Sequence, residues 1–146
     1  MADLTWSAVE EALLAALEAE LGSLVQTVAS YQGKWLEDLQ TQARRLPAVL
    51  VMLRQGRGEQ VSMGSYDLIL DFTVLVAVRP LRGEAEARRG AGGLYQILEG
   101  VRRALWHRDL GLEIVPFSLE REEAWLTTPE LAVYGAQYRT SLMQNF

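Results

Sequence analysis

The fold is decided by the segment YDLILDFTVLVAV, which runs from Tyr66 to Val78. Successive side chains of a β-strand point to opposite faces of the sheet, so every second residue lies on one face. The even positions of this segment are all apolar: Tyr66, Leu68, Leu70, Phe72, Val74, Val76 and Val78. The pattern therefore predicts one long strand whose even positions face the hydrophobic core.

The odd positions of this strand form a mixed surface. They are Asp67, Ile69, Asp71, Thr73, Leu75 and Ala77. Such a surface is too polar for a core and too apolar for a plain solvent-facing side. Two interpretations remain open: it is a subunit interface, or it is a face that is partly covered within the same domain.

Two amphipathic helices are predicted, one before and one after this strand. The first spans about Trp6–Glu20, where apolar residues recur every three or four positions, and Ser7 and Glu10 have the spacing of a capping box. The second spans Leu94–Trp106 and has a similar apolar stripe. A shorter helix is expected within Trp35–Arg45, before Pro47 interrupts it.

The remaining segments are mostly strand candidates, and the Gly- and charge-rich run Gln55–Glu59 is expected to be a loop. The further predicted strands are Leu24–Tyr31, Ala48–Leu53, Leu112–Phe117, Glu122–Thr128 and Leu131–Met143. We therefore expect a single domain over residues 1–146 with an α+β fold. Its sheet is mostly antiparallel, with the two main helices packed on one face.

Composition limits the classes of function. The formal net charge of −5 argues against a general nucleic-acid-binding protein, which needs an excess of Lys and Arg. Cysteine is absent, so disulfides and thiolate sites are excluded. The longest apolar segment, Leu68–Val78, is interrupted by polar residues and is far shorter than the roughly 20 residues of a membrane-spanning helix. We expect a soluble protein without a secretory signal.

No recognisable catalytic or metal-binding pattern is found. His107 is the only histidine, and it is interpreted as a helix-end residue. Asp67 and Asp71 would lie roughly 13 Å apart along one strand, too far for the paired carboxylates of a glycosidase. The Gly90–Gly93 cluster precedes a helix but lacks the spacing of a phosphate-binding loop. We therefore expect no catalytic residues, no metal and no cofactor.

Four segments, in order along the chain, resemble the tail-terminator (tail-completion) family of Mu-like phages and prophages. They are VASYQG at Val28–Gly33, LPAV at Leu46–Val49, the long run Val74–Arg102, and DLGL at Asp109–Leu112. The longest of these is the most specific, and the resemblance extends over nearly the whole chain. The resemblance implies a tail-terminator-like α+β fold and no catalytic residues or cofactors.

The resemblance also implies a structural role in a contractile phage tail. Subunits of this kind assemble into a ring, usually a hexamer, that caps the head-proximal end of the tail tube and ends its polymerisation. The implied partners are other copies of the chain, the tube protein and head-neck proteins, with the sheath protein as a further candidate. The implied location is the bacterial cytoplasm during assembly and the virion tail afterwards.

The residue pattern suggests where such a ring would be joined. The candidate interface residues are Asp67, Ile69, Asp71, Leu75, Arg57 and Met63. The first four lie on the mixed face of the long strand. The last two lie in the Arg54–Gly64 segment that precedes it, which is a candidate loop for reaching a neighbouring copy or the tube. The alternative functions are a head-tail connector, a tube-like ring protein, a small cytosolic enzyme without a recognisable motif and, least favoured, a nucleic-acid module.

Overall fold

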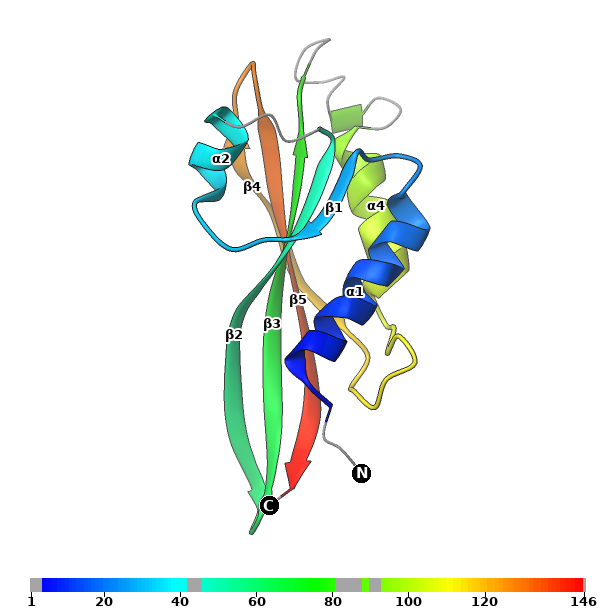
Figure 1. The fold of residues 1–146 in the computed structure, drawn as a ribbon, viewed down its shortest axis with the longest axis vertical. Helices are drawn as coiled ribbons and strands as arrows, with labels where there is room; N and C mark the ends of the chain where they lie inside the picture. The colour runs from blue at the N-terminus through cyan, green and yellow to red at the C-terminus, as the bar shows by residue number, and fades with distance from the viewer. Residues whose placement is uncertain (1–3, 42–45, 81–87, 90–92, 146) are drawn as a thin grey trace.

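A computed structural model describes residues 4–41, 46–80, 88–89 and 93–145. Its centre is a five-stranded sheet in the order β1-β2-β3-β5-β4 (Figure 1). The strands are β1 (Thr27–Ser30), β2 (Ala48–Ser62), β3 (Ser65–Val78), β4 (Ser118–Thr127) and β5 (Ala132–Asn145). Neighbouring strands are antiparallel except for β1 and β2, which are parallel. The predicted α+β class is confirmed.

The two main helices, α1 (Trp6–Leu21) and α4 (Leu94–Leu105), pack against each other and against one face of the sheet (Figure 1). We call this side of the sheet the helix face. The core between these layers contains Leu13 and Leu17 of α1, Ile97 of α4, and Phe72 and Val76 of β3, all buried. The even positions of β3 from Leu70 to Val78 therefore face the core as predicted, whereas Leu68 is only partly buried and Tyr66 lies outside this core. Burying the core positions drives the two layers together.

Among the described residues, the opposite side of the sheet, which we call the outer face, is covered at one end. There the short helix α2 (Trp35–Thr41) lies over the sheet, and its Leu39 is buried with Leu75 of β3. Trp35 also packs against Trp125 of β4, with ring centroids 5.6 Å apart. A partly covered face within the same domain therefore explains the apolar part of the mixed strand surface at this end.

The predicted loop at Gln55–Glu59 is wrong, because these residues are part of strand β2. They pair in antiparallel register with β3, with Arg57 opposite Ile69 and Glu59 opposite Asp67. Glycine and charged residues disfavour a strand only weakly, and pairing with the strongly β-forming β3 outweighs that preference. The actual turn lies farther along, at the end of β2, where Gly64 has a positive φ of 82°.

Two further local predictions are wrong. The helix α1 is capped by Thr5, whose side chain accepts a hydrogen bond from the Ala8 amide, and not by Ser7. The side chain of Glu10 instead accepts a hydrogen bond from the Ser30 hydroxyl. The segment Leu112–Phe117 is irregular and is not a strand. In the short helix, residues 42–45 of the predicted span lie outside the described residues.

Gly135 of β5 gives a testable measure of packing on the outer face. A Cβ atom at this position would lie 2.4 Å from Cε2 of the Trp125 ring, which cannot move without disturbing Trp35. We expect Gly135→Ala to lower the free energy of unfolding by about 1–3 kcal/mol because of overpacking. Gly58→Ala is the matched control, since nothing lies within 4 Å of its Cβ position. Equal stability of the two variants in urea denaturation would contradict this packing.

Candidate functional site

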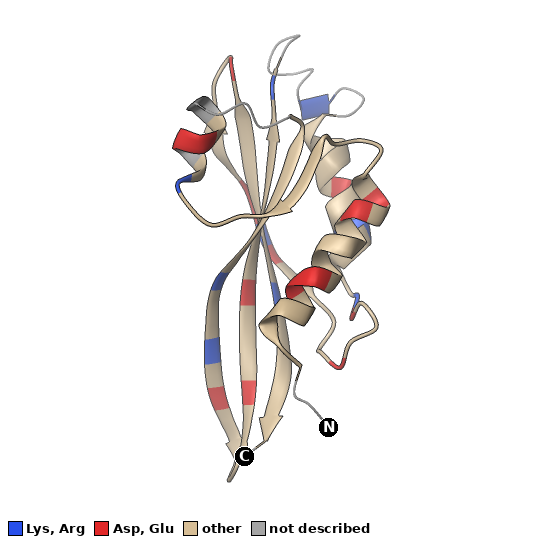
Figure 2. Cartoon of the chain, in the orientation of Figure 1, with Lys and Arg blue, Asp and Glu red and all other residues tan. Residues whose placement is uncertain are grey.

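The ends of β2, β3 and β5 form a three-stranded arm that starts beside α1 and whose end extends beyond both main helices (Figure 1). We define the arm as residues 53–62 of β2, 65–71 of β3 and 139–145 of β5. It exists because these strands are 14 or 15 residues long, whereas β1 has only 4 and β4 has 10. Figure 2 shows acidic and basic residues distributed along the arm. The arm contains most of the residues that the sequence suggested as an interface.

The structure brings four of the six candidate interface residues together. Asp67, Ile69 and Asp71 occupy alternate positions of β3 and share the outer face of the arm with Arg57, which pairs with Ile69. Met63 lies at the end of the arm and is 98% exposed. Of these residues, Asp67 and Ile69 are half-buried and Arg57 is exposed, so all three can contact a partner.

Leu75 is different, because it is fully buried against α2 within the same chain. It has no exposed surface to offer a partner in this structure, so its predicted place in the interface is corrected. The physical reason is the cover that α2 provides on the outer face. The interface hypothesis is thereby restricted to the arm.

Asp71 is also buried, at the base of the arm, where its carboxylate receives several donors. The Arg139 Nε atom donates to its Oδ1 atom at 2.7 Å, and the Gln55 Nε2 atom donates to its Oδ2 atom at 2.9 Å. Arg54 adds an ion pair at 3.6 Å. Burial by itself raises the pKa of this carboxyl, but these hydrogen bonds and the two arginine charges outweigh it, so the pKa lies below its usual value.

This cluster joins all three strands of the arm, since Arg54 and Gln55 come from β2, Asp71 from β3 and Arg139 from β5. A substitution such as Asp71→Arg would therefore disturb the fold as well as any interface. Asp67 and Arg57 are the better positions for testing the outer face.

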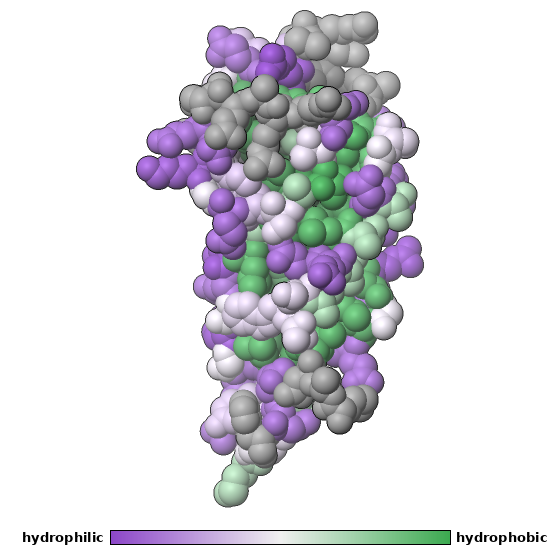
Figure 3. All heavy atoms as spheres, viewed as in Figure 1, coloured by the Kyte–Doolittle hydropathy of each residue, from purple (hydrophilic) through white to green (hydrophobic). Residues whose placement is uncertain are grey.

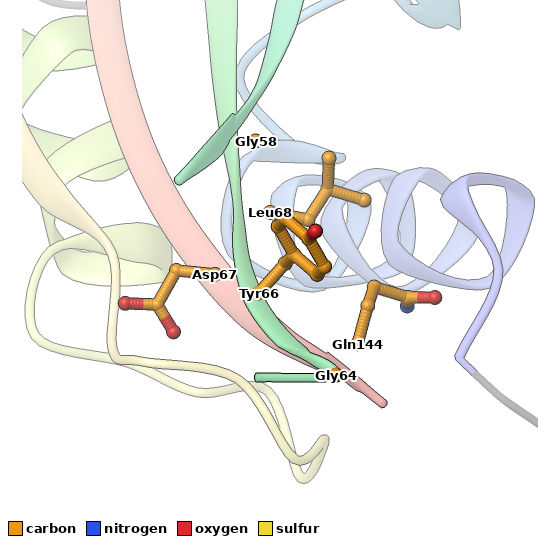
Figure 4. A pocket seen from close by; sticks show the side chains of 6 residues that line it. All are labelled: Gly58, Gly64, Tyr66, Asp67, Leu68 and Gln144. Carbon is orange, nitrogen blue, oxygen red and sulfur yellow. The ribbon is translucent and has the colours of Figure 1, made fainter. Parts of the chain in front are cut away.

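On the helix face, the arm has a hollow of about 510 Å³. It is lined by Gly58, Gly64, Tyr66, Asp67, Leu68 and Gln144. Figure 4 shows Tyr66, Leu68 and Gln144 on one side of the sheet and Asp67 pointing to the other. The hollow exists because Gly58 leaves open space beside Leu68 and Tyr66, and these two side chains make its lining mostly apolar. It is therefore suited to apolar side chains rather than to charged ligands.

Large apolar side chains are exposed on and beside the arm. They are Val61 (52%), Met63 (98%) and Met143 (58%) on the arm, and Trp6 (43%) at the start of α1, where its ring lies over Gly56. Figure 3 shows apolar surface beside the polar side chains along this side of the molecule and at the end of the arm. Exposed apolar residues that gather in one region mark an interaction surface. The sequence pattern did not identify Val61 and Met143 as exposed residues, because their exposure depends on how far along β2 and β5 the neighbouring strands β1 and β4 extend.

The described residues contain no group of three His, Asp or Glu side chains that is placed to hold a metal ion. His107 lies at the end of α4, is exposed and stacks on Trp106. Within the described parts of the chain, no helix combines the length and the apolar character that crossing a membrane requires.

The chain is an α+β protein with two main helices on one face of a mostly antiparallel sheet and a projecting, partly apolar β-arm. A family model described as "Bacteriophage Mu, Gp37" matches residues 5–143, nearly the whole sequence. The chain therefore belongs to the Gp37 family of Mu-like phage proteins. No curated protein matches it.

Proposed function

We propose that the protein is a non-enzymatic structural subunit of a contractile phage tail. In this role several copies form a ring, of hexameric size, that caps the head-proximal end of the tail tube and stops its growth. The observation that supports it most is family membership across residues 5–143, because it makes the chain a Mu-like phage protein. The resemblance to tail terminators supplies the particular role.

The arm gives this proposal a physical basis. A strand arm with exposed apolar side chains is poorly stabilised in isolation and gains stability when a partner covers it. A contact between two different surfaces of identical chains generates a ring when the rotation closes. In the proposed assembly the arm contacts a neighbouring copy or the tube, and the tube, sheath and head-neck proteins are the further partners.

The measurement that tests this role is the length of tail tubes assembled in vitro from tube protein. We expect tubes to become shorter and more uniform as the chain is added, because each capped end stops growing. A head-tail connector or a tube-like ring protein would leave the length distribution unchanged or would lengthen the tubes. Unchanged tube lengths at saturating amounts of the chain would contradict the terminator role.

A matched pair of variants tests whether the arm takes part in capping. Met63→Asp places a charge at the end of the arm, where the native side chain is 98% exposed, and we expect it to weaken the shortening of tubes. Trp106→Ser changes an exposed apolar residue (40%) away from the arm and is expected to cap like the wild type. The reverse order of effects would place the contact elsewhere on the molecule.

A further inference from the structure

Both lateral edges of the arm are unpaired over most of their length. On one side, β1 pairs with β2 only at Ala48–Val51. On the other side, β4 pairs with β5 only at Ala132–Arg139. Among the described residues, the one backbone hydrogen bond recorded farther along β5 is from the Val115 amide to the Ser141 carbonyl. In the part of the chain that the structure describes, the arm therefore presents backbone donors and acceptors without a backbone partner along both edges, except at Ser141.

The direction of these backbone groups on β5 follows from that hydrogen bond. Because the Ser141 carbonyl accepts from Val115, the backbone groups of Ser141 point away from β3. In an antiparallel ladder this direction alternates along the strand, so the amide and carbonyl of Met143 also point outward. Since Val115 already occupies the Ser141 carbonyl, the free edge of β5 is defined by Met143 and Asn145.

The same reasoning identifies the free edge of β2. The backbone amide and carbonyl of Met143 point away from β3, so Met143 does not form a hydrogen-bonded pair with Asp67, the residue opposite it on β3. The backbone groups of Asp67 therefore point to β2, where they form a hydrogen-bonded pair with Glu59. The backbone groups of the residues before and after Glu59 on β2 must then point away from β3. The free edge of β2 is therefore defined by Gly56, Gly58 and Gln60.

The β5 edge lacks the features that usually prevent strands from pairing, whereas β2 carries Arg54, Arg57 and Glu59 and has register shifts at both ends of the arm. Exposed edges are normally protected by charged side chains, proline or bulges. The outward-pointing residues on both edges carry no charge and include no proline. The segment Thr140–Asn145 is uncharged throughout and pairs with β3 without a register shift. An edge of this kind is suited to pairing with another strand.

We propose that the β2 edge of one copy pairs with the β5 edge of the next copy, in parallel, so that neighbouring arms form one continuous sheet. This inference rests on the proposed ring and names the surface that joins it. The strand that pairs with each edge comes from a second copy of the chain. The two edges complement each other in strand direction, in the alternation of their outward-pointing backbone groups (their phase) and in shape.

The direction fits because β2 and β5 are both antiparallel to β3 and therefore run the same way. A copy placed beside the first, in the same orientation, brings β2 next to β5 as parallel strands. The phase also fits. In a parallel pair, the residues of one strand whose backbone groups point to the partner carry their side chains on one face of the sheet, and the corresponding residues of the partner strand carry theirs on the other face. Gly58 lies on the helix face and Met143 on the outer face, so the two edges meet this condition.

The shape and charge of the two edges fit as well. Gly58 has no atom within 4 Å of its Cβ position, so side chains of the neighbouring β5 can lie beside it and cover the hollow next to Leu68. On the outer face, Met143 would lie near the ion pair of Arg57 and Glu59, whose atoms are 3.6 Å apart. No like charges meet there. Because the two edges differ, the contact is head-to-tail, and it closes a ring when the rotation between neighbouring copies closes.

The test compares two substitutions at Met143. Met143→Pro removes the outward amide but leaves the β3 pairing intact, and proline is tolerated on an edge strand. Met143→Ala removes the same exposed side chain and keeps the amide. By light scattering over a concentration series, we expect wild type and Met143→Ala to form a ring-sized species. We expect Met143→Pro to raise the dissociation constant about tenfold or more relative to Met143→Ala.

The β2 edge offers a second, independent pair. Gln60→Pro removes an outward amide from the other edge, and Gln60→Ala is its control. Proline variants that unfold at the same temperature as their alanine controls but do not associate support the pairing. Proline variants that associate like their controls overturn it and leave the ring to be joined by another surface. A wild type that stays monomeric at all concentrations also overturns it, whereas the tube-length assay separately decides the capping role.

Discussion

Replacing Phe72 with alanine is expected to lower the free energy of unfolding by about 3–5 kcal/mol. Phe72 is 1% exposed and lies at the middle of β3, between the sheet and the two main helices. Its ring meets that of Phe117 edge to face, with centroids 6.1 Å apart. Removing the ring leaves a cavity where β3, the helices and the segment before β4 meet. Urea denaturation of the monomer measures the effect.

The control for this prediction is Val115→Ala. Val115 is 57% exposed and lies two residues before Phe117, so its side chain contributes little burial. We expect a change of roughly 0.5 kcal/mol or less for this variant. A loss of less than 1 kcal/mol for Phe72→Ala would mean that the helix layer and the sheet do not share one core.

The helix face could be predicted from the sequence because its signal is local. Alternating apolar residues from Tyr66 to Val78 can satisfy only one strand face, and the stripe on α1 reappears as four fully buried residues, Val9, Leu13, Leu17 and Leu21. Each of these patterns is contained within a single element. The class of fold then follows from the order of the elements.

The arm could not be predicted because it depends on pairing between distant residues. Gln55–Glu59 has the composition of a loop, but it is held as strand by residues of β3 that follow the turn. Phe117 is buried although Leu112–Phe117 is irregular, because tertiary packing rather than strand pairing covers it. Local composition contains no information about either arrangement.

The positions of the candidate interface residues could be predicted only where they depend on a local pattern. Alternation along β3 placed Asp67, Ile69 and Asp71 on one face, as the structure has them. Sequence alone could not show that α2 covers Leu75, since Leu39 is 36 positions away in the chain. It also could not show that Met143 lies exposed on an unpaired edge, which depends on where β4 begins. Whether the arm joins subunits remains a prediction.

The buried carboxylate of Asp71, at the base of the arm, is the basis of the second prediction with a large effect on stability. We expect Asp71→Asn to lower the free energy of unfolding at neutral pH by about 1.5–3 kcal/mol, the usual range for hydrogen bonds to a charged group. The substitution keeps the size of the side chain but removes the charge that Arg139 and Arg54 contact. Asp67→Asn, on the same face but only half-buried, is the control and is expected to change stability by roughly 0.5 kcal/mol or less.

The dependence on pH gives the same prediction a second readout. Because the pKa of Asp71 is lower in the folded protein than in the unfolded chain, its contribution is fully present above the unfolded value of about 3.9. It is lost as the pH falls through the folded value. Wild type and Asp67→Asn should therefore lose more stability than Asp71→Asn between about pH 5 and pH 2. Parallel stability curves for all three proteins would show that the Asp71 cluster does not hold the three strands of the arm together.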